Sequence, residues 1–592
     1  MKKKIVMINL VLAMALVLGL STFALAEYSV EENLELYPGW IGTDAQNLPT
    51  TMPIFTYSAT AGAATVINET VWVEVPCDTD RDGIRDRVSV HIRRPNAPGF
   101  KCPAVMEFSP YHEGTISWNR VYSLATNADE HVRDLASTAR YHNNYPLTQA
   151  INPDTTDMTY DDIRYKGVNA WDPIWWTTLP FETGSPYSNP CPPATVPTST
   201  VNLGSTPPSY TAIARHQQYF VRGYAMLYGQ LLGSRTSTGI TNSQHVEEWL
   251  SVASVAQWLR GEAQAFTTRT GDIAVVCTWS NGNIALDGTS YPGTTPMLAA
   301  MSGVPGVKAI MPEATVFSWY EYYRAGGAVN SPEGYGGEDM NNHSSFNFSR
   351  FNSDSTTGIP PATGANFPLA IQKVYVETQK HMMKVQDRET GDYNAEWDAR
   401  NLSRGFSHIN PDVGILQTGG LMDWNVKPKH TFGEMHALRD NFSGNYKYVA
   451  GLTVHASQNG RLVPGKDGVE RGMLKWYLMF LDKHLLGIDN RVNELMWDIT
   501  LPNNITGVME GFDYDVDVEE RGTIVPGTTY QKIYLVPSAE EGKAGRLSYY
   551  APEDAIEQYA DMDIHAQLTQ PTPQGTTALS ATDRTTIPPS SN

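Results

Sequence analysis

Cysteine is scarce in this sequence, with only four among 592 residues. Small domains that depend on disulfides contain many more, so the chain is not a disulfide scaffold, and the sequence leaves open whether one pair is bridged after export. Neither a Cys-x-x-Cys nor a His-Glu-x-x-His motif occurs. A zinc or thiol enzyme therefore has little support, and we expect no cofactor to be required for catalysis. The four cysteines are Cys77, Cys102, Cys191 and Cys277.

Basic residues are also few, with 43 Lys and Arg against 63 Asp and Glu, which gives a formal net charge of -20 at pH 7. Nucleic acid and anionic membranes repel such an acidic chain, so we expect neither as a partner. Beyond the first 26 residues no apolar run is long enough to span a bilayer. The length allows two or three domains with a large core.

The N-terminus has the three parts of a secretory signal peptide. Residues 1–4 are basic, residues 5–20 are apolar, and residues 24–26 form an Ala-Leu-Ala cleavage site. A membrane anchor is the alternative, but the apolar stretch is short and a cleavage site follows it. We therefore expect residues 1–26 to be removed, leaving a secreted protein in the extracellular or cell-envelope space that begins at Glu27.

Helical and strand patterns alternate along the rest of the chain. Residues 70–75 and 87–92 alternate at period two around a turn and predict a β-hairpin. A helix over 247–260, a helix over 294–301 and a strand over 307–311 indicate an α/β fold with a doubly wound sheet. The predicted segments are the signal peptide (1–26), an N-terminal surface arm (27–69), the first part of the α/β core (70–325) with a Pro-rich insertion (118–211), a helical cap (326–405), the second part of the core (406–496), and a partial β-domain with a disordered tail (497–592).

The turn of the predicted hairpin is rich in carboxylates. Asp78, Asp80, Asp82 and Asp86 have the spacing of a calcium-binding loop. An EF-hand loop also needs a bidentate glutamate at its twelfth position, where this chain has Ser89. Carboxylates are common in plain hairpin turns as well. The sequence therefore leaves structural calcium open.

The rest of the chain is organised around an apolar run that ends in Gly288-x-Ser290-x-x-Gly293 and continues as a helical pattern. Strand, sharp turn and helix is the order of a nucleophile elbow, which would expose the Ser290 hydroxyl. An ordinary Gly-rich turn is the alternative, and for this motif alone it is the commoner explanation. A serine nucleophile also needs a base, an orienting carboxylate and donors for the oxyanion.

Two downstream residues supply the first two of these partners. Asp423 and His455 each follow a predicted strand, and the chain order Ser290, Asp423, His455 is that of the α/β-hydrolases. His455 would take the serine proton while Asp423 fixes the imidazole tautomer. Alternatively, Asp423 caps a loop, and His455 is only one of fourteen histidines. The competing bases His430 and His436 fall in a predicted helix rather than after a strand.

The oxyanion needs two donors. The first should be the backbone N–H of Tyr291, because it directly follows the nucleophile. For the second we predict the hydroxyl of Tyr111, which lies just beyond another predicted strand.

Four motifs of the chain occur together in one known family. They are Trp279-Ser280-Asn281-Gly282 with the turn at 288–293, Ser318-Trp319-Tyr320-Glu321-Tyr322-Tyr323-Arg324, Gly336-Gly337-Glu338-Asp339, and Asp423-Trp424-Asn425-Val426-Lys427-Pro428. By these motifs the chain resembles the Xaa-Pro dipeptidyl-peptidases, a serine hydrolase family that also includes cocaine-esterase-like acyl hydrolases. The similarity covers roughly residues 70 to 500 and implies a family that removes N-terminal Xaa-Pro dipeptides from peptides. It also implies an α/β-hydrolase domain, a helical cap and a C-terminal β-sandwich.

By this resemblance, Glu338 and Asn425 would hold the free ammonium of a peptide whose second residue is proline. A flat proline ring suits an aromatic slot, and a cation suits a carboxylate with neutral acceptors. The alternative is that the aromatic residues are simply core. The residues implied to line the proline pocket are Tyr111, Tyr291, Trp319, Tyr322 and Val426.

Two departures from the family pattern leave alternatives open. The segment before the core is short compared with some family members, so the oligomeric state stays open. The chain also stops where the β-sandwich would have barely begun, which leads us to expect an incomplete sandwich. The alternatives to the peptidase are an esterase or amide acylase on the same scaffold, and a truncated, inactive secreted binding protein.

Overall fold

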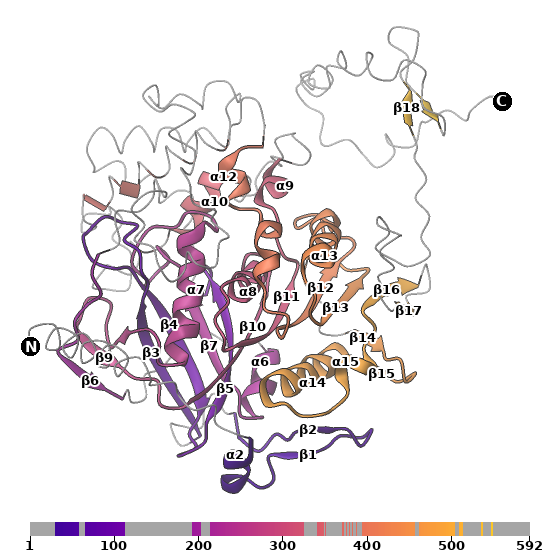
Figure 1. Ribbon diagram of the computed structural model, residues 1–592, viewed down its shortest axis with the longest axis horizontal. Helices are drawn as coiled ribbons and strands as arrows, with labels where there is room; N and C mark the ends of the chain where they lie inside the picture. Colours follow the sequence, from indigo (N-terminus) through magenta and orange to yellow (C-terminus); the bar gives the residue numbers. More distant parts are fainter. Residues whose placement is uncertain are drawn as a thin grey trace, which may run out of the picture. The chain divides into compact units, whose positions relative to one another are not determined.

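The computed structural model describes the α/β part of the chain in detail (Figure 1). The predicted signal peptide, Cys191, Glu338 and most of the Pro-rich insertion lie outside the described residues. The described ranges are 30–57, 65–112, 192–202, 214–324, 340–348, 350, separate positions between 370 and 386, 393–455, 461–503, 508–512, 534–536 and 546–548.

A largely parallel sheet runs through the centre of the described chain. The second of its central strands, β4, is antiparallel to both neighbours, and all pairs from β7 to β13 are parallel. This is the topology of an α/β-hydrolase sheet, as the sequence predicted. In spatial order the central strands are β3 (Val66–Glu74), β4 (Arg87–Pro95), β7 (Ala225–Gln230), β5 (Cys102–Ser109), β10 (Ser280–Thr289), β11 (Val307–Glu313), β12 (Gly414–Gly420) and β13 (Tyr446–Gly451).

The sheet extends beyond this central part at both edges. Next to β13 lie β16 (Ile499–Asn503) and β17 (Val508–Phe512). Next to β3 lie β8 (Ala265–Phe266), β9 (Ile273–Val275) and β6 (Ser199–Val201). The strand that leads into the turn at Ser290 is β10, while β9 lies near the far edge of the sheet, between β8 and β6.

Helices cover both faces of the sheet, which makes it doubly wound. On one face α7 packs against α8, and α8 packs on β10 and β11. On the other face α14 packs on the same strands, and Arg215 of α6 interacts with Tyr477 of α14. These helices are α6 (Ala214–Phe220), α7 (Val246–Leu259), α8 (Tyr291–Met301), α13 (Pro428–Asn441) and α14 (Met473–Leu486).

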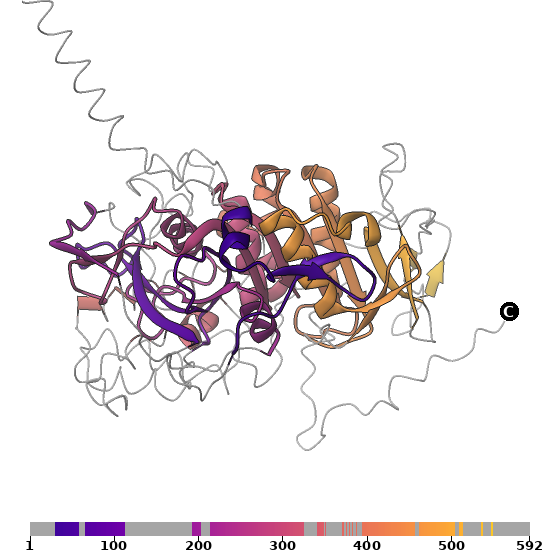
Figure 2. The same cartoon turned by 90° about the horizontal axis from the view of Figure 1, so that it is seen from below.

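The segment predicted as a surface arm is instead built into the core. It forms α2 (Val30–Leu36) and a hairpin of β1 (Ile41–Thr43) and β2 (Pro49–Thr51) that lies against α14 (Figure 2). The buried carboxylate of Asp482 accepts hydrogen bonds from Thr50, Thr51 and Tyr224 at 2.7–2.9 Å. Trp40 is fully buried. A single Trp and two threonines in a polar stretch gave no periodic signal of this packing.

The region after residue 497 also differs from the prediction. Because β16 and β17 pair with the main sheet, the first compact unit reaches Val516, and 517–592 form a second unit. The described part of that unit is a hairpin of β18 (Tyr534–Val536) and β19 (Arg546–Ser548). The short strands therefore complete the hydrolase sheet before any separate β-domain begins.

Three helices are described in or next to the region predicted as a helical cap, 326–405. They are α10 (Met340–Asn347), α12 (Ala395–Asp398) and a 3₁₀ helix, η4 (Leu402–His408). The remaining described elements are α9 (Trp319–Tyr323), β14 (Leu462–Pro464), β15 (Glu470–Gly472) and α15 (Val492–Leu495).

Two further findings concern the cysteines and the membrane. Cys102 and Cys277 are buried, free thiols, and Cys77 is buried with its Sγ 3.7 Å from Oδ2 of Asp86. Among the helices in the described ranges, none combines the length and the apolar character needed to cross a bilayer.

Candidate active site

Ser290 lies alone between β10 and α8, in a strained conformation. Its backbone angles are φ 71° and ψ -126°, which a residue with a side chain rarely adopts. Its N–H donates to the carbonyl oxygen of Glu313 on β11 at 2.9 Å. A Cβ at Gly288 would overlap the Pro292 carbonyl, and one at Gly293 would overlap the Glu313 carbonyl. Close approach of the backbone thus explains both glycines, and the turn has the elbow geometry predicted from the sequence.

Asp423 and His455 follow β12 and β13, at the same edge of the parallel sheet as Ser290. The Oδ2 atom of Asp423 lies 2.7 Å from Nδ1 of His455. The other oxygen, Oδ1, accepts the N–H groups of Asn425 and Val426 at 2.9 and 3.0 Å. Asp423 therefore caps its loop and also contacts His455, so the two interpretations of this residue hold together. Because Nδ1 binds the carboxylate, Nε2 is the nitrogen available to a nucleophile.

The competing histidine, His430, has a different environment. It is fully buried in α13, and its ring packs against the rings of Phe317 and Tyr322. Burial lowers the pKa of His430 to about 3. These contacts are those of a core histidine.

The two predicted oxyanion residues lie close together. The rings of Tyr111 and Tyr291 are 5.9 Å apart, centroid to centroid. The Tyr291 hydroxyl donates to Glu248 at 2.6 Å and accepts the Gln244 N–H at 3.1 Å. Its side chain is thus held in place by α7, while its backbone N–H, in the first turn of α8, has no acceptor within the helix.

The residues implied to bind proline form a continuous aromatic cluster. The ring of Trp319 lies 5.3 Å from that of Tyr291 and 5.5 Å from that of Tyr322. The Tyr322 hydroxyl donates to Oδ1 of Asn425 at 2.9 Å. Val426 and Trp319 are each only 1% exposed. The four aromatic members, Tyr111, Tyr291, Trp319 and Tyr322, therefore lie in one cluster, and the burial of the last three is that of core residues.

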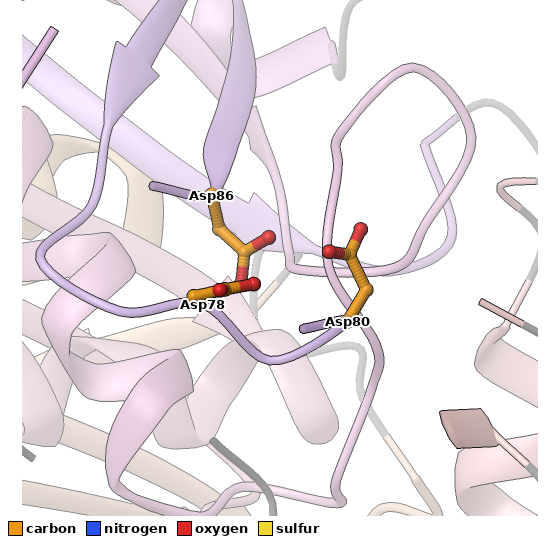
Figure 3. Close-up of side chains that lie close together, drawn as sticks. All are labelled: Asp78, Asp80 and Asp86. Atoms are coloured by element: carbon orange, nitrogen blue, oxygen red, sulfur yellow. The ribbon is translucent and has the colours of Figure 1, made fainter. Parts of the chain in front are cut away.

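The predicted calcium loop joins β3 and β4. Asp78, Asp80 and Asp86 are buried, and one carboxylate oxygen from each lies within 4.8 Å of the others (Figure 3). Asp82 does not join them, because it is exposed and its carboxylate accepts the Ile84 N–H. Three of the four carboxylates predicted from the sequence are thus grouped in the structure.

The charges in this loop are only partly balanced. Arg350 forms an ion pair with Asp80, which leaves two further carboxylates in the cluster. Burial, reinforced by the neighbouring carboxylates, raises the pKa of Asp78 to about 6 and that of Asp86 well above its usual range. Thr79 and Thr238 donate hydrogen bonds to Asp86. Three buried oxygen ligands with unbalanced charge fit a hard cation such as calcium.

Beneath the elbow lies a charged network that sequence patterns did not reveal. Arg215 donates two hydrogen bonds to Asp287 of β10 at 2.8 and 2.6 Å. Burial pushes the pKa of Asp287 up, but the Arg215 guanidinium and a hydrogen bond with His216 together outweigh burial and hold that pKa below its usual value. Arg215 also lies 3.9 Å from Glu313, which accepts the Thr289 hydroxyl at 2.6 Å. The partners are far apart in sequence, so no local motif marks them.

Comparisons with known proteins give the same family as the motifs in the sequence. A model of the family "X-Pro dipeptidyl-peptidase (S15 family)" matches residues 82–457. The Xaa-Pro dipeptidyl-peptidase of Pediococcus pentosaceus is 30% identical over 513 residues, which cover 84% of this chain and 55% of the relative. That of Lactiplantibacillus plantarum is 34% identical over 443 residues, covering 74% and 47%. The chain thus spans about half the length of these curated relatives.

Solved structures resemble the chain less closely. The crystal structure of an aminopeptidase from a marine sediment archaeon, Thaumarchaeota archaeon, is 14% identical. The matched region covers 84% of this chain and 64% of the aminopeptidase chain, with a TM-score of only 0.42. The family match and the sequence relatives are sufficient by themselves: this chain belongs to the X-Pro dipeptidyl-peptidase (S15) family.

Proposed function

We propose that this chain is a serine exopeptidase that releases N-terminal Xaa-Pro dipeptides from peptides through an acyl-enzyme. The observation that carries the proposal is the 2.7 Å contact between Asp423 and His455, at the sheet edge where Ser290 occupies a strained elbow. Family membership supports the same chemistry and the choice of substrate.

In the proposed reaction, the Ser290 hydroxyl attacks the carbonyl carbon of the substrate proline. Nε2 of His455 accepts the hydroxyl proton and returns it to the leaving amine, so the peptide bond breaks as the ester to Ser290 forms. Asp423 holds Nδ1–H and stabilises the imidazolium. Water, activated by the same His455, then releases the dipeptide and restores the serine.

The oxyanion of each tetrahedral intermediate would be held by the Tyr291 N–H and the Tyr111 hydroxyl. The aromatic cluster with Trp319 and Tyr322 would take the proline ring. Asn425 and Glu338 would hold the free ammonium of the substrate. Tyr322 supports this role of Asn425, because the hydrogen bond from its hydroxyl fixes the amide orientation.

The test is release of chromophore from Gly-Pro and Ala-Pro anilides by mature protein. Ser290→Ala should abolish the release, and an N-acetylated Ala-Pro anilide should not be cleaved because it lacks the ammonium. If the protein hydrolysed simple esters but not the anilides, the proposed peptidase function would be wrong and an esterase or acylase function would take its place. Inactivity on both, with no labelling of Ser290 by a fluorophosphonate, would indicate an inactive binding protein.

We further propose that the protein is exported after removal of residues 1–26. The basic, apolar and Ala-Leu-Ala parts of the N-terminus support this. The measurement is mass spectrometry of the protein recovered from the medium or cell envelope of the expressing bacterium, where a first residue of Glu27 is expected. Recovery only of protein that retains residues 1–26 would refute it.

Structural calcium in the loop between β3 and β4 also stays a prediction. The expected result is that calcium raises the thermal unfolding midpoint of the metal-free protein and that Asp86→Asn removes this rise. Asp82→Asn is the matched control, because this exposed carboxylate lies outside the cluster, and it should keep the rise. Equal midpoints with and without calcium would refute the prediction.

A further inference from the structure

A buried histidine connects two tyrosines beside the candidate active site. Nε2 of His343, on α10, lies 2.9 Å from the hydroxyl oxygen of Tyr111, and its Nδ1 lies 2.8 Å from that of Tyr323. The imidazole is 6% exposed and packs against the rings of Tyr291 and Trp319 at 5.0 and 5.5 Å. His343 is thus held on several sides, and both of its nitrogens face a phenol.

Burial determines the charge of this imidazole. It lowers the pKa of His343 to about 3, so the ring is neutral near pH 7. A neutral imidazole has one N–H donor and one acceptor nitrogen, so only two arrangements of the hydrogen bonds are possible.

The two arrangements differ in what Tyr111 can do. If Nδ1 carries the proton, Tyr111 must donate its only hydroxyl proton to Nε2, and none remains for a substrate. If Nε2 carries the proton, Tyr323 donates to Nδ1 and Nε2–H donates to the Tyr111 oxygen. The Tyr111 proton is then directed elsewhere, and the donation to its oxygen strengthens it as a donor.

We propose that His343 is a positioning residue: Tyr323 fixes its tautomer, and its Nε2–H directs the Tyr111 hydroxyl proton into the oxyanion hole. This inference rests on the function proposed above, in which Tyr111 stabilises the oxyanion. His343 touches no reacting atom and acts only through Tyr111. No pattern in the sequence marks it, since α10 lies in a region that reads as a loop.

A double-mutant cycle on the Ala-Pro anilide tests this dependence. Tyr111→Phe should lower kcat by about 10²–10³-fold with KM nearly unchanged, as expected for loss of one oxyanion donor. His343→Phe should lower kcat by at least about 10-fold, up to that ceiling. In the Tyr111→Phe background, His343→Phe should cause no further loss, because the group through which it acts is gone.

Two more variants separate positioning from structural damage. His343→Gln keeps an amide N–H that can donate to Tyr111, so it should recover part of the lost kcat. Tyr323→Phe removes the group that fixes the tautomer, so it should lower kcat less than His343→Phe and also show no effect in the Tyr111→Phe background. His484→Phe, on α14 and outside the site, is the control for replacing a histidine and should leave kcat unchanged.

The outcomes distinguish this inference from the function on which it rests. An equal fold-loss from His343→Phe in both backgrounds, or no loss in either, would overturn the role of His343 while the peptidase stands. Inactivity of the wild-type chain on the anilide would instead refute the proposed substrate. If the chain hydrolyses esters, the same cycle is measured on the ester, since the oxyanion is common to both reactions.

Discussion

Removing the guanidinium of Arg215 should destabilise the protein strongly. Its side chain and that of Asp287 are 7% and 2% exposed, and the two hydrogen bonds between them are 2.8 and 2.6 Å long. In Arg215→Met the Asp287 carboxylate would stay buried without the guanidinium, with His216 3.4 Å away as a weaker partner and close to a second carboxylate, Glu313. Breaking a buried ion pair in this way costs about 3–5 kcal/mol.

The measurement is the free energy of unfolding from urea titration at pH 7. A matched double variant, Arg215→Met with Asp287→Asn, removes both charges and should recover at least half of the loss. Arg215→Lys keeps the charge but cannot bind both carboxylate oxygens in parallel, so it should fall between wild type and Arg215→Met.

The pH dependence provides a second check. In wild type, the pKa of Asp287 is below its usual value of 3.8, so the pair contributes stability above that value and loses it as pH falls through the folded-state pKa. Arg215 is the largest influence that opposes the effect of burial on the pKa of Asp287, so that pKa should rise in the variant, which should then gain stability as pH falls from 7 to 5. The difference in the free energy of unfolding between Arg215→Met and wild type should therefore become smaller as pH falls from 7 to 5. The reasoning would be refuted if Arg215→Met lost less than about 1 kcal/mol of unfolding free energy at pH 7. It would also be refuted if the difference in unfolding free energy from wild type did not change with pH.

Three other predictions concern a tightly packed glycine, a buried glutamate and two buried cysteines. Gly293→Ala should prevent the elbow from forming and yield insoluble or strongly destabilised protein, whereas Gly472→Ala, with open space around its Cβ, should shift the urea midpoint little. Burial raises the pKa of Glu107 to about 8, so the native carboxyl keeps a proton that the unfolded chain releases above about 4.5, and stability falls as pH rises between these values. The fall in the free energy of unfolding amounts to about 5 kcal/mol at most, and Glu107→Gln should lack it. Equal dependence of stability on pH in wild type and Glu107→Gln would contradict this prediction. Burial also raises the pKa values of Cys102 and Cys277 to about 12, so iodoacetamide should label neither in folded protein, while rapid labelling before unfolding would contradict their burial.

The sequence predicted those features that depend on local patterns. Hydrophobic periodicity located α7 and most central strands, and the glycine spacing located the elbow at Ser290. The positions of Ser290, Asp423 and His455 after predicted strands also located the edge of the sheet at which all three lie, because the carboxyl ends of parallel strands share one edge.

Features that depend on contacts between distant segments were not predictable in this way. The Arg215–Asp287 pair spans 72 positions, and the Tyr111–His343 pair spans 232. Trp40 is buried with its ring against Phe100 and its indole N–H donating to the carbonyl of Arg222, 182 positions away, which a local window cannot show. Asp82 has the spacing of a calcium ligand, but the turn directs its carboxylate to a nearby N–H instead.

The strained elbow and the charged network beneath it form one connected arrangement. The φ of 71° at Ser290 costs about 1–3 kcal/mol, which surrounding interactions must offset. Glu313 supplies two of them, since its carbonyl accepts the Ser290 N–H and its carboxylate accepts the Thr289 hydroxyl. Arg215 lies beside that carboxylate and clamps β10 through Asp287. Because β10 and β11 both contact Arg215 of α6, the network that stabilises the core also holds Ser290 in position. If Ser290 is the nucleophile, as proposed, loss of Arg215 should lower activity in the fraction of protein that remains folded.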